Sequence, residues 1–155
     1  MGIKLSGIKL SEAILRQCPQ LKNSYAIKVG VADGSTYPNG QSVAQVAEWN
    51  EYGNSRIPAR PFMAPTLFKH AEHWPAQFAW ILKQSNFKVD EAVEALANTI
   101  VGQVKMEINE VWEPPLAAST LAARVRKSPS GEATNKPLID TGLMFNSITY
   151  QVEKK

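Results

Sequence analysis

Apolar residues recur with helical spacing through the middle of the chain. Between residues 65 and 81 they follow 4-3-4-3 spacing, at Leu67, Ala71, Trp74, Phe78 and Ile81. This spacing is the apolar stripe of an amphipathic helix, and Pro65 suits its first turn. Pro75 lies inside the stripe. Because proline removes a backbone donor and clashes with the preceding turn, we expect this helix to be kinked or split in two.

A second, longer helical stripe follows. Its apolar positions are Val93, Leu96 or Ala97, Ile100, Val104, Ile108 and Val111. They mark one face of a helix over about five turns. Asp90 is expected to cap the start of this helix, and Pro114 and Pro115 are expected to end it.

Two other stretches alternate between apolar and polar residues, as strands do. Their apolar positions are Ile27, Val29 and Val31 in residues 25–33, and Ile148, Tyr150 and Val152 in residues 147–155. A period of two places these side chains on one face, so both stretches are predicted to be half-buried strands. The turn-rich sequence "GSTYPNG", 34–40, ends the first of them.

Capping signals delimit two shorter helices. Ser42 precedes "VAQVAEWNEY", Gln45 stands three residues on as in a capping box, and Gly53 is the expected C-terminal stop. Near the N-terminus, a helix over Glu12–Gln17 is expected to stop at Pro19.

These elements predict an α+β fold. We expect a single domain over residues 1–155, with a small mixed or antiparallel sheet packed with two long helices. Residues 113–141 have no long pattern and predict a long loop, with one short helix around Thr120–Arg126. Loops of this length are usually functional or disordered.

Composition narrows the class of protein only slightly. Hydrophobic residues make up 44% and charged residues 20%, which are ordinary values for a globular protein. The net charge of +3 is compatible with a nucleic-acid partner but too small to require one. The N-terminal residues lack an uninterrupted apolar h-region, and no run approaches the roughly 20 apolar residues of a membrane span. We therefore expect no membrane partner, and a protein made in a cytoplasm.

Catalytic and metal signatures are weak. His70 and His73 form H-x-x-H around Glu72, which suits a metal, but no third ligand has suitable spacing. Two solvated histidines are therefore the favoured interpretation. Cys18 is the single cysteine, so no intrachain disulfide can form, and a buried or tolerated thiol is favoured over a nucleophile. Without a nucleophile elbow or a phosphate loop, we expect no enzyme activity and no cofactor.

The segment "EYGNSRIPARPFM", residues 51–63, carries two prolines and two arginines between aromatic residues. It suits neither a central strand nor a helix, so we interpret it as an extended arm. One hypothesis makes the arm and the helix before it a subunit or partner interface, formed by Trp49, Tyr52, Arg56, Ile57, Pro58, Arg60 and Phe62. Trp, Tyr and Arg are enriched at interface hot spots, and prolines reduce the entropy lost on docking. The alternative makes Trp49 and Tyr52 core anchors.

A second candidate is the basic stretch "ARVRKSPSG". Arg124, Arg126 and Lys127 have no acidic residue near them from Leu116 to Gly131. A loop with three such charges suits DNA phosphates or an acidic patch on a partner. The alternative is a solvated loop that is basic by chance.

Two motifs resemble those of a family of tailed-phage proteins. "VAEWNEYGNSRIPARPFMAPT" resembles a segment in which a helix ending near E-x-G leads into IPARPF(M/L) and then a long helix. "KPLIDTGLMFNSITYQV" resembles the family's C-terminal P-L-x-D-T-G-x-L-x-x-S-I turn, which runs into a last strand. The family is the neck and tail-completion group, with the head–tail joining proteins of the HK97 gene-product-10 type and the phage virion morphogenesis proteins.

The matching positions are Ile57, Pro58, Ala59, Arg60, Pro61 and Phe62 in the first motif, and Leu138, Asp140, Thr141, Gly142, Ser147 and Ile148 in the second. Asp140 before Thr141 and Gly142 also suits an N-cap of a short structural turn. Met144 and Phe145 stand where many relatives carry a basic residue followed by another side chain.

The resemblance implies a structural virion protein, located at the neck or tail and made in the cytoplasm of the bacterial host. It implies an α+β fold, no enzyme activity, and a self-assembled ring of six-fold symmetry. Its other partners would be the neighbouring head-connector, adaptor or stopper proteins and the tail terminator or tube proteins, with non-specific contact to DNA in the channel. Two alternatives stay open: a tail terminator or minor tail protein that sets tube length, and a small DNA-binding accessory protein that uses residues 116–131.

Overall fold

A three-stranded antiparallel sheet forms one layer of the molecule in the computed structural model, which describes residues 2–5, 16, 18, 21 and 24–154. Its strands are β1, Gly2–Leu5, β2, Tyr25–Val31, and β3, Ile148–Lys154, in the order β1-β2-β3. In β2, Ile27 and Val29 are buried whereas Lys28 between them is exposed. The two strands predicted from alternation are therefore confirmed, and β1, which the sequence analysis did not predict, adds an edge.

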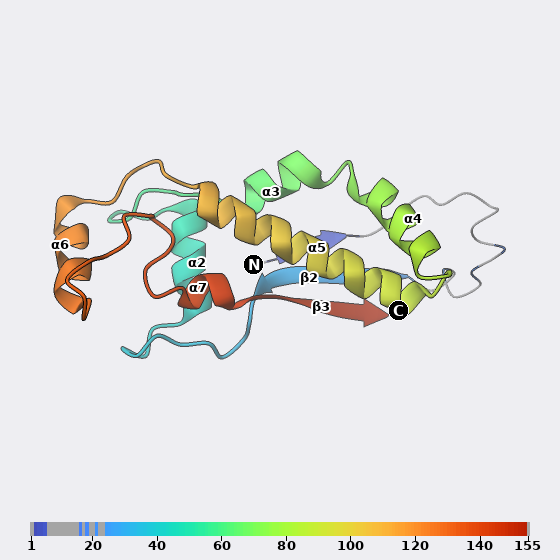
Figure 1. The fold of residues 1–155 in the computed structure, drawn as a ribbon, viewed down its shortest axis with the longest axis horizontal. Coiled ribbons are helices and arrows are strands. Elements are labelled where there is room, and N and C mark those ends of the chain that lie inside the picture. Colours follow the sequence, from blue (N-terminus) through green and yellow to red (C-terminus); the bar gives the residue numbers. More distant parts are fainter. Residues whose placement is uncertain (1, 6–15, 17, 19–20, 22–23, 155) are drawn as a thin grey trace.

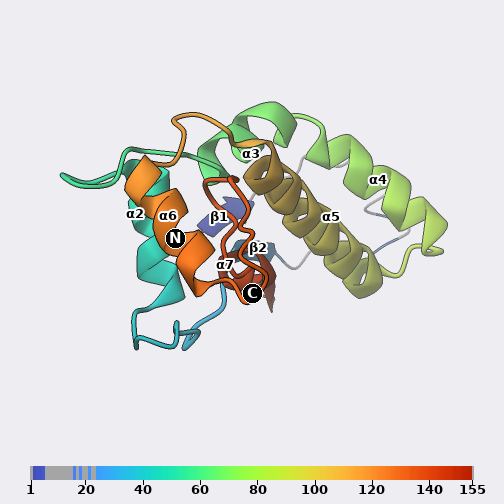
Figure 2. The same ribbon diagram turned by 60° about the vertical axis from the view of Figure 1, so that its left-hand side comes forward.

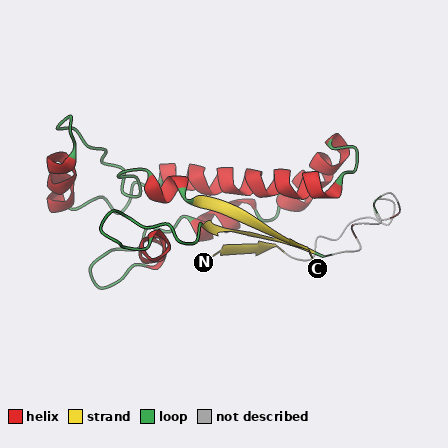
Figure 3. Ribbon diagram, turned by 90° about the horizontal axis from the view of Figure 1, so that it is seen from below, coloured by secondary structure: helices red, strands yellow, loops and turns green. Residues whose placement is uncertain are grey.

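The long helix α5, Val89–Glu110, packs against this sheet (Figure 1). Seen from below, the long helix forms a layer over one face of the strands (Figure 3). Its predicted stripe is buried at Val93, Leu96, Ala97, Ile100, Val104 and Ile108, whereas the last predicted position, Val111, is the C-cap residue and only partly buried. Because α5 presents this stripe to β2 and β3, the core lies between the helix and the sheet.

The start of α5 differs from the prediction. The helix begins at Val89, with Lys88 at the N-cap position, so Asp90 lies in the first turn and does not cap it. Val89 is 2% exposed, and burying this side chain favours an earlier start of the helix. The Asp90 carboxylate accepts a hydrogen bond from the Tyr25 hydroxyl at 2.9 Å and so links α5 to β2.

The predicted 65–81 helix is split in two, as Pro75 led us to expect. α3, Met63–His70, and α4, Trp74–Gln84, are separate helices that pack beside α5 (Figure 2). Pro75 lies in the first turn of α4, where its missing N–H has no partner to lose. The Trp74 indole is fully buried and donates to Gln103 Oε1 of α5 at 2.8 Å, which fixes α4 on the long helix.

The other helices lie at one end of the molecule. They are α2, Val43–Tyr52, α6, Ala118–Lys127, and the short α7, Leu143–Asn146 (Figure 1). In α2, Ser42 Oγ accepts the Gln45 N–H and Gly53 is the C-cap, as predicted. The predicted short helix in the long loop is present as α6, which buries none of its residues. Most of the predicted helix at Glu12–Gln17 lies outside the described residues.

Candidate functional site

The arm begins at a buried carboxylate. Glu51, in the last turn of α2, is 5% exposed. Its Oε2 accepts the N–H groups of Phe62 and Met63, at 2.7 and 2.9 Å, and its Oε1 accepts the Ala64 N–H at 2.8 Å. These donors are the first N–H groups of α3, which its own N-cap residue, Phe62, leaves without a side-chain acceptor. Glu51 therefore caps α3 from the preceding helix.

Residues 53–59 form a compact turn between these two helices. The Asn54 side-chain oxygen accepts the N–H groups of Arg56 and Ile57, and the Asn54 N–H donates to the Ile57 carbonyl at 2.8 Å. Gly53 has φ 73° and ψ 173°, and a Cβ there would lie 2.8 Å from the Ala59 backbone nitrogen. The arm is thus folded onto its own chain.

Arg60 and Phe62 are buried within the chain, so the hypothesis that they contact a neighbouring subunit is wrong. Phe62 is 0% and Arg60 is 5% exposed. Arg60 Nε donates to the Pro114 carbonyl at 2.6 Å, and its Nη2 donates to the Pro115 carbonyl at 2.8 Å. Arg60 therefore joins the arm to the segment that follows α5, and Phe62 belongs to the core.

Of the three cations in the predicted basic loop, Arg124 has a structural role, and Arg126 and Lys127 are exposed. The Arg124 side chain is 9% exposed, and its Nη1 donates to the carbonyls of Thr134, Lys136 and Ile139. Its Nη2 donates to a fourth carbonyl, that of Pro137. Arg124 holds residues 134–139 together and is not available to DNA, which corrects its assignment. Arg126 and Lys127 are exposed at the end of α6.

The turn at residues 140–142 leads into α7, and the N-cap residue of this helix is not the predicted Asp140. Gly142, in the left-handed conformation with φ 76°, is the N-cap residue of α7. The Thr141 hydroxyl accepts the Leu143 N–H at 3.3 Å, whereas Asp140 Oδ1 lies 3.4 Å from Arg124 Nε. The N-cap role predicted for Asp140 is therefore wrong. The Asp140 carboxylate instead forms an ion pair with the Arg124 guanidinium, an attraction between opposite charges.

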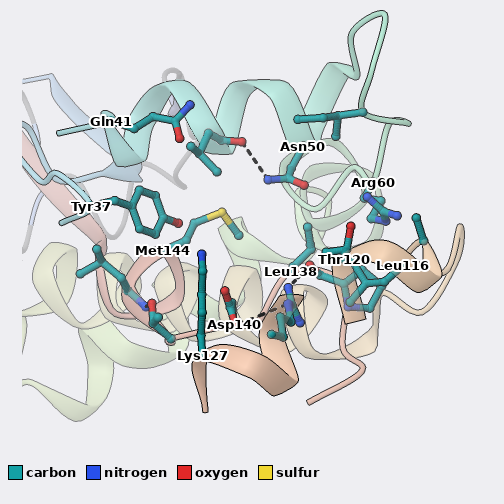
Figure 4. A pocket seen from close by; sticks show the side chains of 18 of the residues that line it. Tyr37, Gln41, Asn50, Arg60, Leu116, Thr120, Lys127, Leu138, Asp140 and Met144 are labelled. Carbon is teal, nitrogen blue, oxygen red and sulfur yellow. Dashed lines mark hydrogen bonds and ion pairs between the residues drawn. The ribbon is translucent and has the colours of Figure 1, made fainter. Parts of the chain in front are cut away.

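The two sequence motifs meet across a groove of about 930 Å³ (Figure 4). One wall comes from residues 37–41, α2 and the arm, and the other from residues 115–127 and 137–144. Figure 4 shows the side chains of Tyr37, Lys127, Leu138 and Met144 around this space. From the predicted set, the groove contains Arg56, Ile57, Pro58, Arg60, Arg124, Lys127, Asp140, Thr141 and Gly142. Trp49, Tyr52, Phe62 and Arg126 do not line it.

The groove is electropositive. Its lining includes the cations Arg56, Arg60, Arg124 and Lys127, and the single carboxylate of Asp140. Burial, and then the neighbouring charge of Arg124, lower the pKa of Arg60.

Tyr37 is a partly buried aromatic residue in the groove wall formed by residues 37–41, α2 and the arm. Burial, and secondarily the negative charge of Asp140, raise the pKa of the Tyr37 hydroxyl. A phenol with the ordinary pKa of 10.0 is already protonated at neutral pH, so Tyr37 is a hydrogen-bond donor in the groove.

Sequence reasoning missed several residues of this site. Tyr37 belongs to the stretch 34–40, which predicted only a turn, and Gln41 received no prediction. Glu51 was treated as part of a motif without a role. Glu51 lies 11 to 13 positions before the N–H groups that it caps, so the one local signal is the apolar residue, Phe62, at the N-cap position of α3.

Other candidate chemistry is scattered over the surface. His73 Nε2 lies 3.5 Å from Glu72 Oε1, and both side chains are mostly exposed. In the part of the chain that the structure describes, no cluster of His, Cys, Asp and Glu has the three members needed to hold a metal ion. Among the described helices, none combines the length and the apolar character that crossing a membrane requires.

Comparison of this chain with protein-family models, with curated proteins and with solved structures finds no match.

Proposed function

We propose that this protein is a structural virion protein of a tailed phage. It completes the tail, or joins the tail to the head connector, as a ring of copies at the neck. In this role it has no enzyme activity, and its partners are further copies of itself and the neighbouring connector, stopper, terminator or tube proteins.

The observation that carries the proposal is the meeting of the two motifs. Residues 56–60 and 137–144 are about 80 positions apart in the sequence, yet they line one groove. Each motif also supplies a residue that orders the walls: Arg60 donates to the Pro114 carbonyl, and Asp140 pairs with Arg124 of α6. A surface that is built by both family-like motifs suits a shared docking role.

Ring assembly would not require one tight site. A ring repeats each weak contact around its axis, so that the effective concentration of neighbouring subunits raises the overall affinity. Exposed apolar side chains are available for such contacts, above all Phe68, which is 91% exposed, and Trp80, which is 64% exposed.

Electron microscopy of lysates from a phage that lacks this gene tests the proposal. We expect DNA-filled heads beside separate tails, and rescue of complete particles by the wild-type gene supplied on a plasmid. Overlong tails would instead assign the tail-terminator role. Normal yields of infectious particles without the gene would contradict a structural role in the virion.

A DNA-binding accessory role is the second candidate. Arg126 and Lys127 are exposed in the last turn of α6, and no side-chain partner of either is found among the described residues. Binding to duplex DNA that weakens steeply with salt, and is lost in Arg126→Glu with Lys127→Glu, would favour this candidate.

A further inference from the structure

The groove has the chemistry of a peptide site. Its apolar lining comes from both walls, with Val46 and Ile57 on one side and Leu138, Leu143 and Met144 on the other. Amide side chains also line it, at Asn39, Gln41 and Asn50, all on the wall formed by residues 37–41 and α2. Apolar surface with a few convergent polar groups is typical of sites that bury a ligand.

The charges of the groove are not balanced within the chain. Asp140 is paired with Arg124. The hydrogen bonds found for the Arg60 side chain among the described residues go to backbone carbonyls, which carry no net charge. Arg56 and Lys127 are exposed on opposite walls, and the described part of the chain offers neither side chain an acidic partner. The excess of positive charge calls for an occupant with carboxylates or phosphates.

Two features favour a polypeptide over a nucleic acid. Tyr37 is the one aromatic residue among the lining residues, whereas single-stranded nucleic acids are held by stacking their bases on several aromatic side chains. The guanidinium groups of Arg60 and Arg124 already donate to backbone carbonyls, which leaves Arg56 and Lys127 as the accessible cations. Two accessible charges between apolar walls suit an acidic peptide that also carries apolar side chains.

We propose that the groove between α2 with the arm and α6 with residues 137–144 binds a peptide segment of a partner protein that contains both acidic and apolar residues. Arg56 and Lys127 receive its carboxylates, and the partly exposed Val46, Ile57 and Leu143 receive its apolar side chains. The choice of a protein as occupant rests on the proposed function, because a joining protein must hold a neighbour in the virion.

Selection from a display library of random 12-residue peptides tests this inference on the purified protein. We expect enriched peptides that combine Asp or Glu with apolar residues. A synthetic copy of the most enriched peptide should bind at least about 10-fold more weakly to Arg56→Glu with Lys127→Glu, measured by fluorescence anisotropy, since two attractive charge contacts become repulsive.

The matched control is Lys83→Glu with Arg16→Glu, which reverses two exposed cations outside the groove. This variant should bind the same peptide within about 2-fold of wild type, because screened charges away from a site contribute little. Circular dichroism of both variants checks that the fold is retained.

Four results would overturn the inference. The first two concern the peptide: a selection without acidic enrichment, or a selected peptide that binds the groove variant as well as it binds the wild type. The other two concern other occupants: a 20-base-pair duplex that displaces the peptide, or self-association, measured by sedimentation, that is lost only in the groove variant. The duplex result would assign the groove to nucleic acid, and the sedimentation result to a second copy. Because this assay uses no phage particle, its failure is distinguishable from a failure of the gene-deletion experiment.

Discussion

At the scale of single residues, three charged side chains hold backbone segments in place: Glu51 and Arg60 are buried, and Arg124 is partly buried. Glu51 accepts three N–H groups at the start of α3, Arg60 donates to the carbonyls of Pro114 and Pro115, and Arg124 donates to four carbonyls of residues 134–139. Hydrogen bonds to charged groups contribute more than neutral ones, and their loss leaves buried backbone groups unpaired. Ordering of the arm and of the loop therefore depends on these three residues.

Substituting Glu51 tests this dependence. Glu51→Ala removes the acceptor of three N–H groups, so we expect the free energy of unfolding to fall by about 3 kcal/mol. Glu51→Gln keeps one strong acceptor and should cost about half as much. Urea denaturation followed by circular dichroism measures both. Glu48→Ala, on the exposed side of α2, is the control and should stay within about 0.5 kcal/mol of wild type. An unchanged midpoint for Glu51→Ala would show that water replaces the carboxylate.

At the scale of elements, the turn after α2 decides where α3 starts. Gly53 brings the chain within contact of Ala59, and Glu51 then reaches the first N–H groups of α3. Further along, the Lys69 ammonium of α3 lies 2.8 Å from Glu107 Oε1 of α5, and this hydrogen bond is the main reason that the pKa of Lys69 is raised. Together with the Trp74–Gln103 bond, it fixes α3 and α4 on the long helix.

Gly53→Ala tests the turn as an element. The combination of φ 73° and ψ 173° belongs to a region that is essentially restricted to glycine, and the new Cβ would meet the Ala59 nitrogen at 2.8 Å. We expect a loss of about 3 kcal/mol in the free energy of unfolding, from backbone strain and from the clash together.

Gly40→Ala is the matched control for this substitution. Gly40 has φ 81°, but a Cβ there would meet nothing within 4 Å, so only the cost of the left-handed conformation applies, about 1 kcal/mol. Urea denaturation of the two variants in parallel gives the difference. Equal losses would mean that the close approach to Ala59 relaxes freely.

At the scale of the whole molecule, one core connects the sheet layer to the groove. Ile27 and Val29 of β2, the buried stripe of α5, and Leu138 and Met144 beside the groove belong to the same cluster. Cys18 lies in this cluster, is 1% exposed, and directs its Sγ to the Phe87 carbonyl. Because it is the single cysteine, its thiol reports on the opening of the core.

Burial raises the pKa of the Cys18 thiol above its ordinary value of 9.0. The unfolded state therefore loses this proton first as pH rises, and the contribution to stability that is present below pH 9.0 is lost progressively above it. We expect the free energy of unfolding to fall less steeply between about pH 8 and 10 in Cys18→Ser than in wild type. Because the two proteins differ only at residue 18, the difference between their pH profiles isolates the thiol.

A thiol-reactive chromogen provides an independent measurement of the same burial. We expect Cys18 to react at least about 100-fold more slowly in the native protein than in urea, because reaction requires opening of the core. Comparable rates in the two conditions would place the thiol at the surface.

The sequence by itself determined the α+β class, the two alternating strands, the stripe of α5, the division of α3 from α4 near Pro75, and the end of α2 at Gly53. These features follow from local physics. Periodic burial requires a periodic pattern, proline removes a backbone donor, and glycine tolerates a positive φ.

Tertiary structure alone decided the roles of the charged residues. Arg60 donates to a carbonyl 54 positions away in the sequence, and Arg124 donates to carbonyls 10 to 15 positions after it. No local sequence pattern therefore distinguishes these two arginines from the exposed Arg56 and Arg126. The same residue type is a buried cross-link or an exposed cation according to which carbonyls the fold brings near it. Which of these roles an arginine has depends on long-range packing. The same packing forms the groove between two motifs that are far apart in the sequence.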